Sequence, residues 1–379
     1  MRFDWSPDQQ AAYRHTLAAV RDRFAEPTKG EFFDREGWRF LGDQGLLGLS
    51  IPTEYGGGGL GALDTARHVE ALGLGCADTG LVFGASAHLF ACAMPLAAFG
   101  TETARNTYLP GMASGALIAG NAMTEDGAGS DVSRLATTAT ETRGGYLLNG
   151  TKSFVTNGPI SDVYITYATT DPYAGHLGIT GFVVPADADG VTPGPAFEKT
   201  GLTSVPAGTV TFDNCFVPRE GMLGVPGQGG AIFQHSMGWE RACLFAGYLG
   251  QLRRVLQRAV AHARTRHQFG APLSANQAVS HRLVDTRLRL EAASLLLYRA
   301  CWEMDQGTSS PLNIALSKLA VSEAAVTGAL DAISVFGARG ILTDGDTGVE
   351  SALRDAVPAT LFSGTSDIQR LIIAKEMGL

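Results

Sequence analysis

Cysteine is scarce in this sequence, and its few copies stand far apart. Five occur among 379 residues, and no two of them form a C-x-x-C pair. An odd and dispersed set does not indicate a disulfide framework, so we interpret the thiols as reduced groups in the core of an intracellular protein. We predict no metal site. The five residues are Cys76, Cys92, Cys215, Cys243 and Cys301.

Long apolar runs and an excess of positive charge are also missing. No stretch of about 18 uninterrupted apolar residues occurs, which argues against a membrane span. The first ten residues, MRFDWSPDQQ, contain no apolar segment typical of a signal peptide. The net charge is −8, whereas a nucleic-acid-binding protein needs a basic face. We therefore expect a cytoplasmic protein that binds neither membranes nor nucleic acids.

The sequence also lacks the glycine pattern of a dinucleotide-binding motif. The glycines Gly56–Gly59 stand together in PTEYGGGGLG, without the spacing of that motif and without a strand–glycine–helix unit around them. A Rossmann domain is therefore not supported. Hydrophobic residues make up 45% of the chain and charged residues 17%, so the composition allows a large buried core.

Regions of different periodicity follow one another along the chain. From Ser6 to about residue 117 the pattern is helical, and Ser6-Pro7 has the residues that begin a helix. From about residue 119 to 223, short runs rich in Val, Ile, Thr, Tyr and Phe alternate with turns, which predicts a β barrel or sandwich. Asn149-Gly150 predicts a hairpin turn between two strands, and Asn157-Gly158 is a second Asn-Gly pair.

The helical pattern returns from about Gly229 to the end. Apolar stripes at helical spacing, separated by loops such as GTSSP, predict an antiparallel four-helix bundle. The stripes are Leu244, Tyr248, Leu252, Val255 and Ala259; Leu283, Leu290, Ala293, Leu297 and Cys301; and Leu316, Leu319, Val326, Leu330 and Ile333. The predicted fold class is thus α+β, with a helical domain at 1–118, a β domain at 119–228 and a helical bundle at 229–379.

Seven segments resemble the acyl-CoA dehydrogenase family, in the family's order and along nearly the whole chain. They are PTEYGGGGL (52–60), YLPGMASG (108–115), AMTEDGAGSD (122–131), NGTKSFVTNG (149–158), RTRHQFGAPLSANQ (264–277), VFGARG (335–340) and FSGTSDIQRLIIAKE (362–376). The family has the same α–β–α order. The resemblance implies an enzyme that uses FAD to oxidise the α,β carbon–carbon bond of an acyl thioester.

The resemblance implies a set of flavin contacts within one subunit. Small and hydroxyl-bearing residues in AMTEDGAGSD suit a close approach of the backbone to the cofactor. Strand alternation would place Phe154 against the flavin ring and Thr156 near its polar edge. Taken alone, these segments would be an ordinary glycine-rich turn and a half-buried strand. The implied contacts are Met123, Thr124, Gly129, Ser130, Phe154, Thr156, Thr365 and Asp367.

A second set resembles the contacts that the family makes to the FAD of a neighbouring subunit. Arg266 would meet the pyrophosphate, because a planar guanidinium matches phosphate oxygens; a solvated basic helix end is the alternative. In the opposing loop, Ser334 and Ala338 stand where the family has Gln and Gly. The implied contacts are Arg266, Gln268, Phe269, Gln277, Gly337 and Gly340. A site shared between subunits implies a homodimer or homotetramer.

The reaction needs a carboxylate that removes the α proton, and many family members carry it just before the Gly-Thr of the C-terminal motif. Here that residue is Ser363, whose hydroxyl is too weak a base, although its backbone N–H could bond to the thioester carbonyl. Glu240 shares a helical face with Leu244 and Tyr248, where desolvation raises a carboxyl pKa. Isovaleryl- and long-chain-type enzymes and carrier-protein-dependent prolyl oxidases have their base at this position.

We therefore predict that Glu240 is the base and that Arg241 supports the site. Arg241 precedes Arg266 by 25 residues, as the family pattern expects. A structural Glu-Arg pair is the alternative for Glu240.

The acyl carrier and the electron acceptor stay open. The loop GLTSVP has Thr203 and Val205 where the family has Arg and Ser, close to the path of the thioester, which favours an unusual substrate or carrier. Similarity to enzymes of polyketide and nonribosomal-peptide assembly points to secondary metabolism. The carrier is coenzyme A or an acyl-carrier protein, and the acceptor is an electron-transfer flavoprotein or oxygen. A flavin oxidase or monooxygenase on the same fold, and an inactive assembly partner, are the alternatives.

Overall fold

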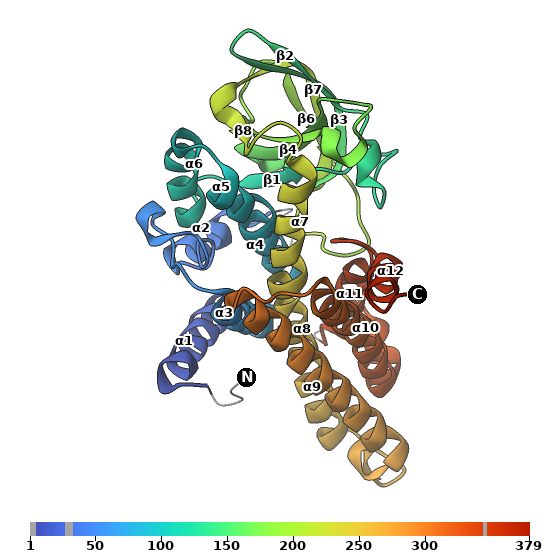
Figure 1. Cartoon of the computed structure of the whole chain (residues 1–379). Helices are drawn as coiled ribbons and strands as arrows, with labels where there is room; N and C mark the ends of the chain where they lie inside the picture. The colour runs from blue at the N-terminus through green and yellow to red at the C-terminus, as the bar shows by residue number, and fades with distance from the viewer. Residues whose placement is uncertain (1–4, 27–32, 344–346) are drawn as a thin grey trace.

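A computed structural model describes residues 5–26, 33–343 and 347–379. Helices form the lower part of the molecule and the strands its upper end (Figure 1). A long helical rod, residues 229–265, runs between them. The order helices, strands, helices confirms the predicted fold class. The three domain ranges given above stay predictions.

The N-terminal region consists of short helices, the first of which begins as its sequence predicts. Ser6 accepts a hydrogen bond from the backbone N–H of Gln9, whose side chain bonds back to Ser6, and Pro7 is the first helical residue. Between α4 and α5 the helix continues through a π-helical segment, His88–Ala93. The helices are α1 (Pro7–Phe24), α2 (Arg35–Asp43), α3 (Ala62–Gly75), α4 (Thr79–Ala87), α5 (Met94–Phe99) and α6 (Glu102–Ser114).

The middle region is one hydrogen-bonded sheet with a core of its own. Its strand order is β6-β7-β3-β2-β4-β5-β8, and β1 pairs in parallel with β4. Tyr146, Phe182 and Phe212 are among the buried side chains that fill this core. The strands are β1 (Ala119–Ala122), β2 (Thr138–Thr142), β3 (Gly145–Thr156), β4 (Val163–Thr169), β5 (Ile179–Pro185), β6 (Val191–Ala196), β7 (Ala207–Pro218) and β8 (Met222–Leu223).

The hairpin predicted at Asn149-Gly150 is wrong. Both residues lie inside β3, and the turn between β2 and β3 instead contains Gly144, at φ 90°. The Asn-Gly pair serves a bulge, because the pairing of β3 with β7 shifts register between Leu148 and Gly150. A side chain on Gly150 would come within 2.5 Å of Thr137. A dipeptide that is typical of hairpin turns thus forms a bulge within a strand.

The C-terminal region is a helical bundle, as predicted. A second π-helical segment, Glu240–Leu244, joins α7 to α8, and a small β9–β10 hairpin links α8 to α9. The first apolar stripe is buried throughout, and the second from Leu290 onward. The elements are α7 (Gly229–Trp239), α8 (Ala246–Thr265), β9 (His267–Gln268), β10 (Ala271–Pro272), α9 (Gln277–Asp305), α10 (Pro311–Phe336), α11 (Val349–Ala356) and α12 (Ser366–Glu376).

The third predicted stripe, on α10, is only partly buried. Leu330 is 49% exposed, and the rest of that stripe is half-buried. The helix instead buries small residues such as Ala325 and Ala329, and at Gly328 any side chain would collide with Leu252. Close helix packing therefore uses the small face of α10 and leaves its larger apolar residues at the margin of the core.

Two helical stretches would be long and apolar enough to cross a membrane by length and composition alone. They are Thr79–Phe99 and Pro311–Ile341. In the first, 83% of the apolar window is buried inside the molecule, so its composition is that of a core helix. The second is 44% buried and includes α10, whose outer face carries the apolar residues just described.

Candidate active site

Glu240 lies where two π-helical segments pack against each other. It opens the segment Glu240–Leu244, which contacts His88–Ala93. The ring of Trp239, the residue before Glu240, stacks on Phe90 of the other segment with centroids 6.2 Å apart. Glu240 is 6% exposed. A π-helical turn holds an extra residue and is frequent at functional sites. The backbone conformation at Glu240 is therefore a second indication of a functional residue, in addition to its buried side chain.

The environment of Glu240 changes its acidity. Burial raises the pKa of Glu240 to about 7, while a hydrogen bond from Ser363 and the charge of Arg241 partly oppose that rise. Within the described ranges, no Lys or Arg forms an ion pair with this carboxylate. The arrangement therefore differs from the structural Glu-Arg pair. A carboxyl with a pKa near neutrality can both accept and release a proton at physiological pH.

Ser363 is held against Glu240 by a network of hydrogen bonds. Its hydroxyl donates to Glu240 Oε2, and its carbonyl accepts from Arg241 Nε at 2.9 Å and from Gln369 Nε2 at 3.3 Å. Gln369 is fully buried and also donates to the carbonyl of Gly364, at 2.9 Å. Ser363 has φ 52°, a left-handed conformation uncommon for residues other than glycine. The surrounding contacts thus fix a strained loop beside the carboxylate.

Aromatic rings cluster next to this pair. Phe362 packs against Phe83, Phe245 and Tyr248, with ring centroids 4.4, 5.5 and 6.0 Å away. One of these rings comes from α4 and the others flank the Glu240 segment and Ser363 in the chain. The rings therefore pack beside the loop that carries Ser363, next to a carboxylate whose burial raises its pKa.

Phe154 is the exposed aromatic residue expected to face the flavin. It is 64% exposed, although its neighbours Ser153 and Val155 are both buried. Its φ of 54° and a register shift between Lys152 and Val155 show that β3 bulges here, so simple strand alternation does not describe this segment. A bulky residue in the left-handed region costs energy and is typical of ligand sites. A broad exposed ring held in this way fits a planar cofactor.

Two other predicted flavin contacts, Met123 and Thr124, are hydrogen-bonded to β3. The backbone N–H of Ser153 donates to Thr124 at 2.8 Å, and Lys152 Nζ donates to the carbonyl of Met123 at 3.2 Å. Lys152 also forms a buried ion pair with Glu125 at 2.8 Å. We did not predict Lys152 or Glu125 from the sequence, although a lysine within an apolar strand was a usable signal.

The remaining residues of the first set lie at the edges of this region. Gly129 and Ser130 are exposed, and a side chain at Gly129 would meet no atom of the chain, which leaves room for a ligand. Thr365 caps α12 by accepting from the N–H of Ile368 at 3.2 Å, and Asp367 is exposed in the first turn. The positive end of a helix dipole therefore faces outward at this point.

Helix α4 connects the β3 end of the site to the Ser363 loop. The side-chain amide of Asn157, next to the predicted contact Thr156, donates to the carbonyl of Gly84 at 3.2 Å. The adjacent Phe83 packs on Phe362, the residue before Ser363. The predicted flavin contacts of the middle domain and the proposed base are therefore joined through one short helix.

The second predicted set forms a separate group at the far end of the bundle. Arg266 follows α8, whose 20 residues span about 30 Å at the α-helical rise. The ring of His262 stacks on Phe336 with centroids 4.2 Å apart, which brings the end of α8 beside Gly337. Within one chain these residues lie at the opposite end of α8 from Glu240. The members of this group are Arg266, Gln268, Phe269, Gln277, Gly337 and Gly340.

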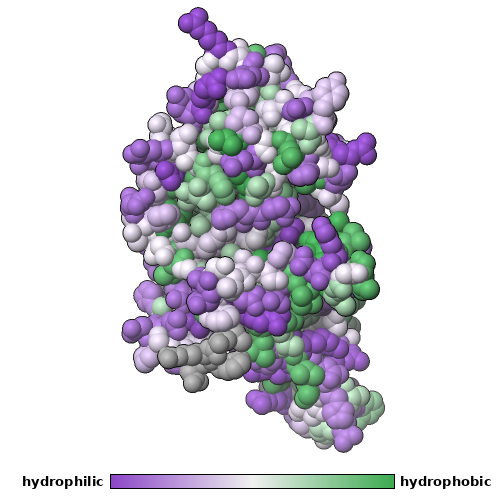
Figure 2. Space-filling model, in the orientation of Figure 1, coloured by the Kyte–Doolittle hydropathy of each residue, from purple (hydrophilic) through white to green (hydrophobic). Residues whose placement is uncertain are grey.

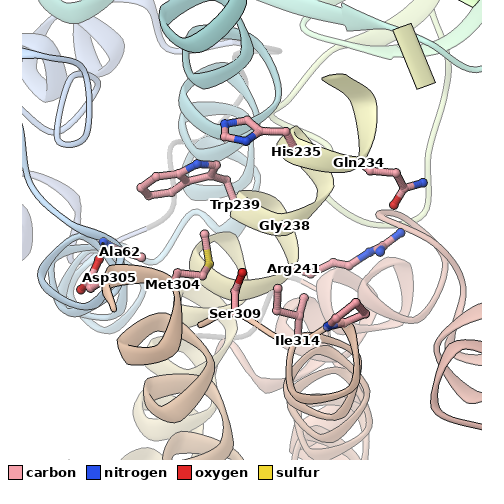
Figure 3. A pocket seen from close by; sticks show the side chains of 11 residues that line it. Ala62, Gln234, His235, Gly238, Trp239, Arg241, Met304, Asp305, Ser309 and Ile314 are labelled. Atoms are coloured by element: carbon pink, nitrogen blue, oxygen red, sulfur yellow. Dashed lines mark hydrogen bonds between the residues drawn. The ribbon is translucent and has the colours of Figure 1, made fainter. Parts of the chain in front are cut away.

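Next to α7 lies a cavity of about 440 Å³ (Figure 3). Its walls include His235 and Trp239 from α7, Arg241 from the π-helical segment that follows α7, Asp305 from the end of α9, and Ile314 from α10. Glu240 does not line this cavity, although its neighbours on both sides do.

The domain descriptions of one family match the chain from end to end. They are the acyl-CoA dehydrogenase N-terminal domain at residues 7–116, the middle domain at 120–215 and the C-terminal domain at 227–378. The chain belongs to the acyl-CoA dehydrogenase family. The predicted fold, flavoprotein class and FAD cofactor are thereby confirmed, and the enzyme is an oxidoreductase that acts on acyl thioesters.

Similar proteins share more than the fold. The chain is 54% identical over 349 residues to the L-prolyl-[peptidyl-carrier protein] dehydrogenase of Pseudomonas fluorescens, which covers 92% of this chain and 91% of the relative. A solved structure of PigA with FAD and proline is similar at a TM-score of 0.97 and 41% identity over all of both chains. The prolyl acyl carrier protein oxidase AnaB is similar at a TM-score of 0.96 and 39% identity, covering 99% of this chain and 100% of AnaB.

Proposed function

We propose that the enzyme oxidises an L-prolyl thioester carried on a peptidyl-carrier protein, with Glu240 as the base. The substrate part of this proposal is supported by the names of the similar proteins, which refer to prolyl groups or proline. The chemical part depends above all on one observation, a buried carboxylate in direct contact with Ser363. Ser363 occupies the position where many family members carry their base.

The reaction breaks two carbon–hydrogen bonds and makes one carbon–carbon double bond. The Glu240 carboxylate takes the α proton, and the electron pair of that bond becomes the new α,β double bond. FAD, when bound, would supply the acceptor for the hydride that leaves the β carbon. The pKa of about 7 makes the carboxylate a stronger base than an exposed Glu, while enough of it is ionised at neutral pH. Its burial keeps most water away from it.

The Ser363 loop has a second task in this proposal. Its backbone N–H would bond to the thioester carbonyl, which would stabilise negative charge on that oxygen as the α proton leaves. Arg241 supports the loop by its bond to the carbonyl of Ser363. It therefore acts as a positioning residue and not as a proton donor.

FAD would be held by two groups of residues. The first consists of the middle-domain contacts around Phe154 and Thr156 together with Thr365 and Asp367 at the start of α12. The second is the Arg266 group at the far end of the bundle, from a neighbouring subunit. Exposed apolar side chains support a homodimer or homotetramer, since large apolar patches mark interfaces. They include Val284, Leu288 and Leu295 on α9 and Leu371 on α12, and hydrophobic surface is visible along this bundle in Figure 2.

The electron acceptor in this proposal is an electron-transfer flavoprotein or oxygen. AnaB is named an oxidase, and this name supports oxygen as the acceptor. Reoxidation of the reduced enzyme by air, measured against its reoxidation by an electron-transfer flavoprotein, separates the two. The cytoplasmic location predicted from the sequence stays a prediction.

The substrate is tested by following flavin absorbance without oxygen. The purified enzyme is mixed with a peptidyl-carrier protein loaded with L-proline, with prolyl-CoA, and with straight and branched acyl-CoAs. We expect rapid bleaching with the prolyl carrier protein and slow or no bleaching with the coenzyme A esters. Bleaching by an acyl-CoA alone would contradict the proposed substrate and leave the dehydrogenase chemistry in place.

A further inference from the structure

The two oxygens of the Glu240 carboxylate are in different surroundings. Oε2 accepts the hydroxyl hydrogen of Ser363, while no side-chain hydrogen bond to Oε1 occurs within the described part of the chain. Ser363 itself cannot easily move away. Arg241 and Gln369 both hold its carbonyl, and the buried side chain of Gln369 holds that of the following Gly364. One carboxylate oxygen is thus anchored to a fixed point.

We infer that the Ser363 hydroxyl is a positioning group for the base: it binds one oxygen of Glu240 and turns the other toward the α proton. This inference rests on the proposed role of Glu240 and assigns to the Ser363 side chain a task separate from that of its backbone N–H. A serine hydroxyl is suited to this task because it donates a hydrogen bond without a charge of its own.

Hydrogen bonding and burial act in opposite directions on this carboxyl. Burial favours its neutral form, whereas a donated hydrogen bond favours its ionised form. Without the hydroxyl, the pKa of Glu240 would rise further, and less of the carboxyl would be ionised at neutral pH. Ser363 therefore keeps a desolvated base available for proton transfer as well as oriented.

The backbone at Ser363 makes a clean test possible. Because its φ is 52°, a glycine at this position relieves backbone strain while it removes the hydroxyl. Ser363→Gly is thus expected to fold and to bind FAD. Ser363→Ala removes the same hydroxyl but keeps the strain, so an effect shared by both variants comes from the missing hydrogen bond. Thr360→Ala is the matched control, because among the described residues that hydroxyl bonds only to the carbonyl of Val357.

The first measurement is the pH profile of anaerobic flavin reduction. In Ser363→Gly and Ser363→Ala we expect the acid limb of kcat/KM to move to higher pH and the rate at pH 7 to fall about tenfold. Part of the loss should return at high pH, where the carboxyl ionises without help. Thr360→Ala should behave as wild type. Unchanged profiles in both Ser363 variants would overturn the inference.

A second measurement does not depend on turnover. The carboxyl band that disappears in Glu240→Gln is followed by infrared difference spectroscopy as pH is changed. Its titration should move to higher pH in Ser363→Gly. An unshifted titration would show that the hydroxyl does not act on Glu240.

A double variant separates this inference from the proposed function. If Ser363 acts through Glu240, then Ser363→Gly has no further effect on flavin reduction in the Glu240→Gln background. Equal losses in both backgrounds would assign Ser363 an independent role and overturn the inference alone. A wild-type rate in the single Glu240→Gln variant would instead overturn the role of Glu240 as base, and the inference with it.

Discussion

The groups of residues at the two ends of α8 differ in how many contacts they make within a single chain. At the α7 end, Glu240 is buried and bonded to Ser363, which Arg241 holds in turn. At the other end, Arg266 and Phe269 are exposed, and Phe269 adopts a left-handed φ of 53° on a short hairpin. In the proposed function, the groups for proton transfer are therefore assembled within one chain, whereas the Arg266 group would bind the FAD of a second chain. Chemistry and cofactor retention should respond to different mutations.

The largest expected effect is on the rate of the chemical step. Glu240→Gln should lower the rate of anaerobic flavin reduction at least about 100-fold, as the loss of a general base typically does. Its FAD content should stay at the wild-type level. Stopped-flow absorbance and the flavin-to-protein ratio measure the two quantities, with Glu54→Gln as an exposed control. A variant that loses FAD in proportion to activity would remove the distinction between the two ends.

At the Arg266 end of α8 we expect a mutation to lower FAD affinity and to leave the chemical step unchanged. Arg266→Ala should weaken FAD binding about 10- to 100-fold, because it removes a charged donor to phosphate. The rate per bound flavin should hardly change. Titration of the flavin-free protein with FAD gives the affinity, and Arg264→Ala is the neighbouring control. A slow chemical step with normal FAD affinity would contradict the assignment of Arg266.

Mixed oligomers would sharpen the same comparison. A dimer of one Glu240→Gln subunit and one Arg266→Ala subunit contains one site with both defects and one with neither, if each site uses both chains. Two differently tagged subunits are expressed together, purified as the mixed species and assayed at an FAD concentration too low to load Arg266→Ala sites. The mixed species should then regain about half of the wild-type activity. Sites built within single chains would show no recovery under this condition, because one lacks the base and the other lacks FAD.

A smaller effect concerns stability and pH. The pKa of Glu240 is about 7 in the folded enzyme against an ordinary value of 4.5, so its protonated form is the one that favours folding. That contribution is complete below pH 4.5 and is lost as pH rises through 7. Relative to wild type, the flavin-free Glu240→Gln variant should therefore gain about 3 kcal/mol of unfolding free energy between acid pH and pH 8. Urea unfolding at a series of pH values measures this gain; a constant difference would contradict the raised pKa.

The smallest effect is expected at Phe269. Because this ring is fully exposed in one chain, Phe269→Ala should change the unfolding free energy of the flavin-free subunit by less than about 0.5 kcal/mol. FAD affinity should nevertheless fall. A large loss of subunit stability would mean that the ring packs within its own chain.

Much of the fold could be predicted from the sequence because its signals are local. The cap at Ser6 and the stripe from Leu244 to Ala259 depend on neighbours within a few turns, and both are confirmed. The outward face of α10 could not be read in this way, because apolar periodicity marks a buried face without saying which partner buries it. Asn149-Gly150 failed for a related reason, since its conformation is set by β7, far away in the chain.

The position of Glu240 followed from a helical face and a family pattern, yet its partner did not. Glu240 and Ser363 are 123 residues apart, and neither segment contains a signal for the other. The sequence indicated a role only for the backbone N–H of Ser363, whereas in the structure its hydroxyl also bonds to Glu240. The buried Lys152–Glu125 pair was missed for the same reason, because only the folded sheet brings the two charges together.

The π-helical segment at Glu240 has a consequence for insertions and deletions. Two consecutive side chains there, Glu240 and Arg241, hold the hydroxyl and the carbonyl of the same residue. A π-helical turn holds one residue more than an α-helical turn, so deleting one residue after Arg241 in this segment would leave a regular α-helix between α7 and α8. The angle between the side chains of Glu240 and Arg241 would then change, and the two could not both keep their bonds to Ser363. The extra residue therefore sets the angle at which two neighbours in the sequence reach one residue of a distant loop.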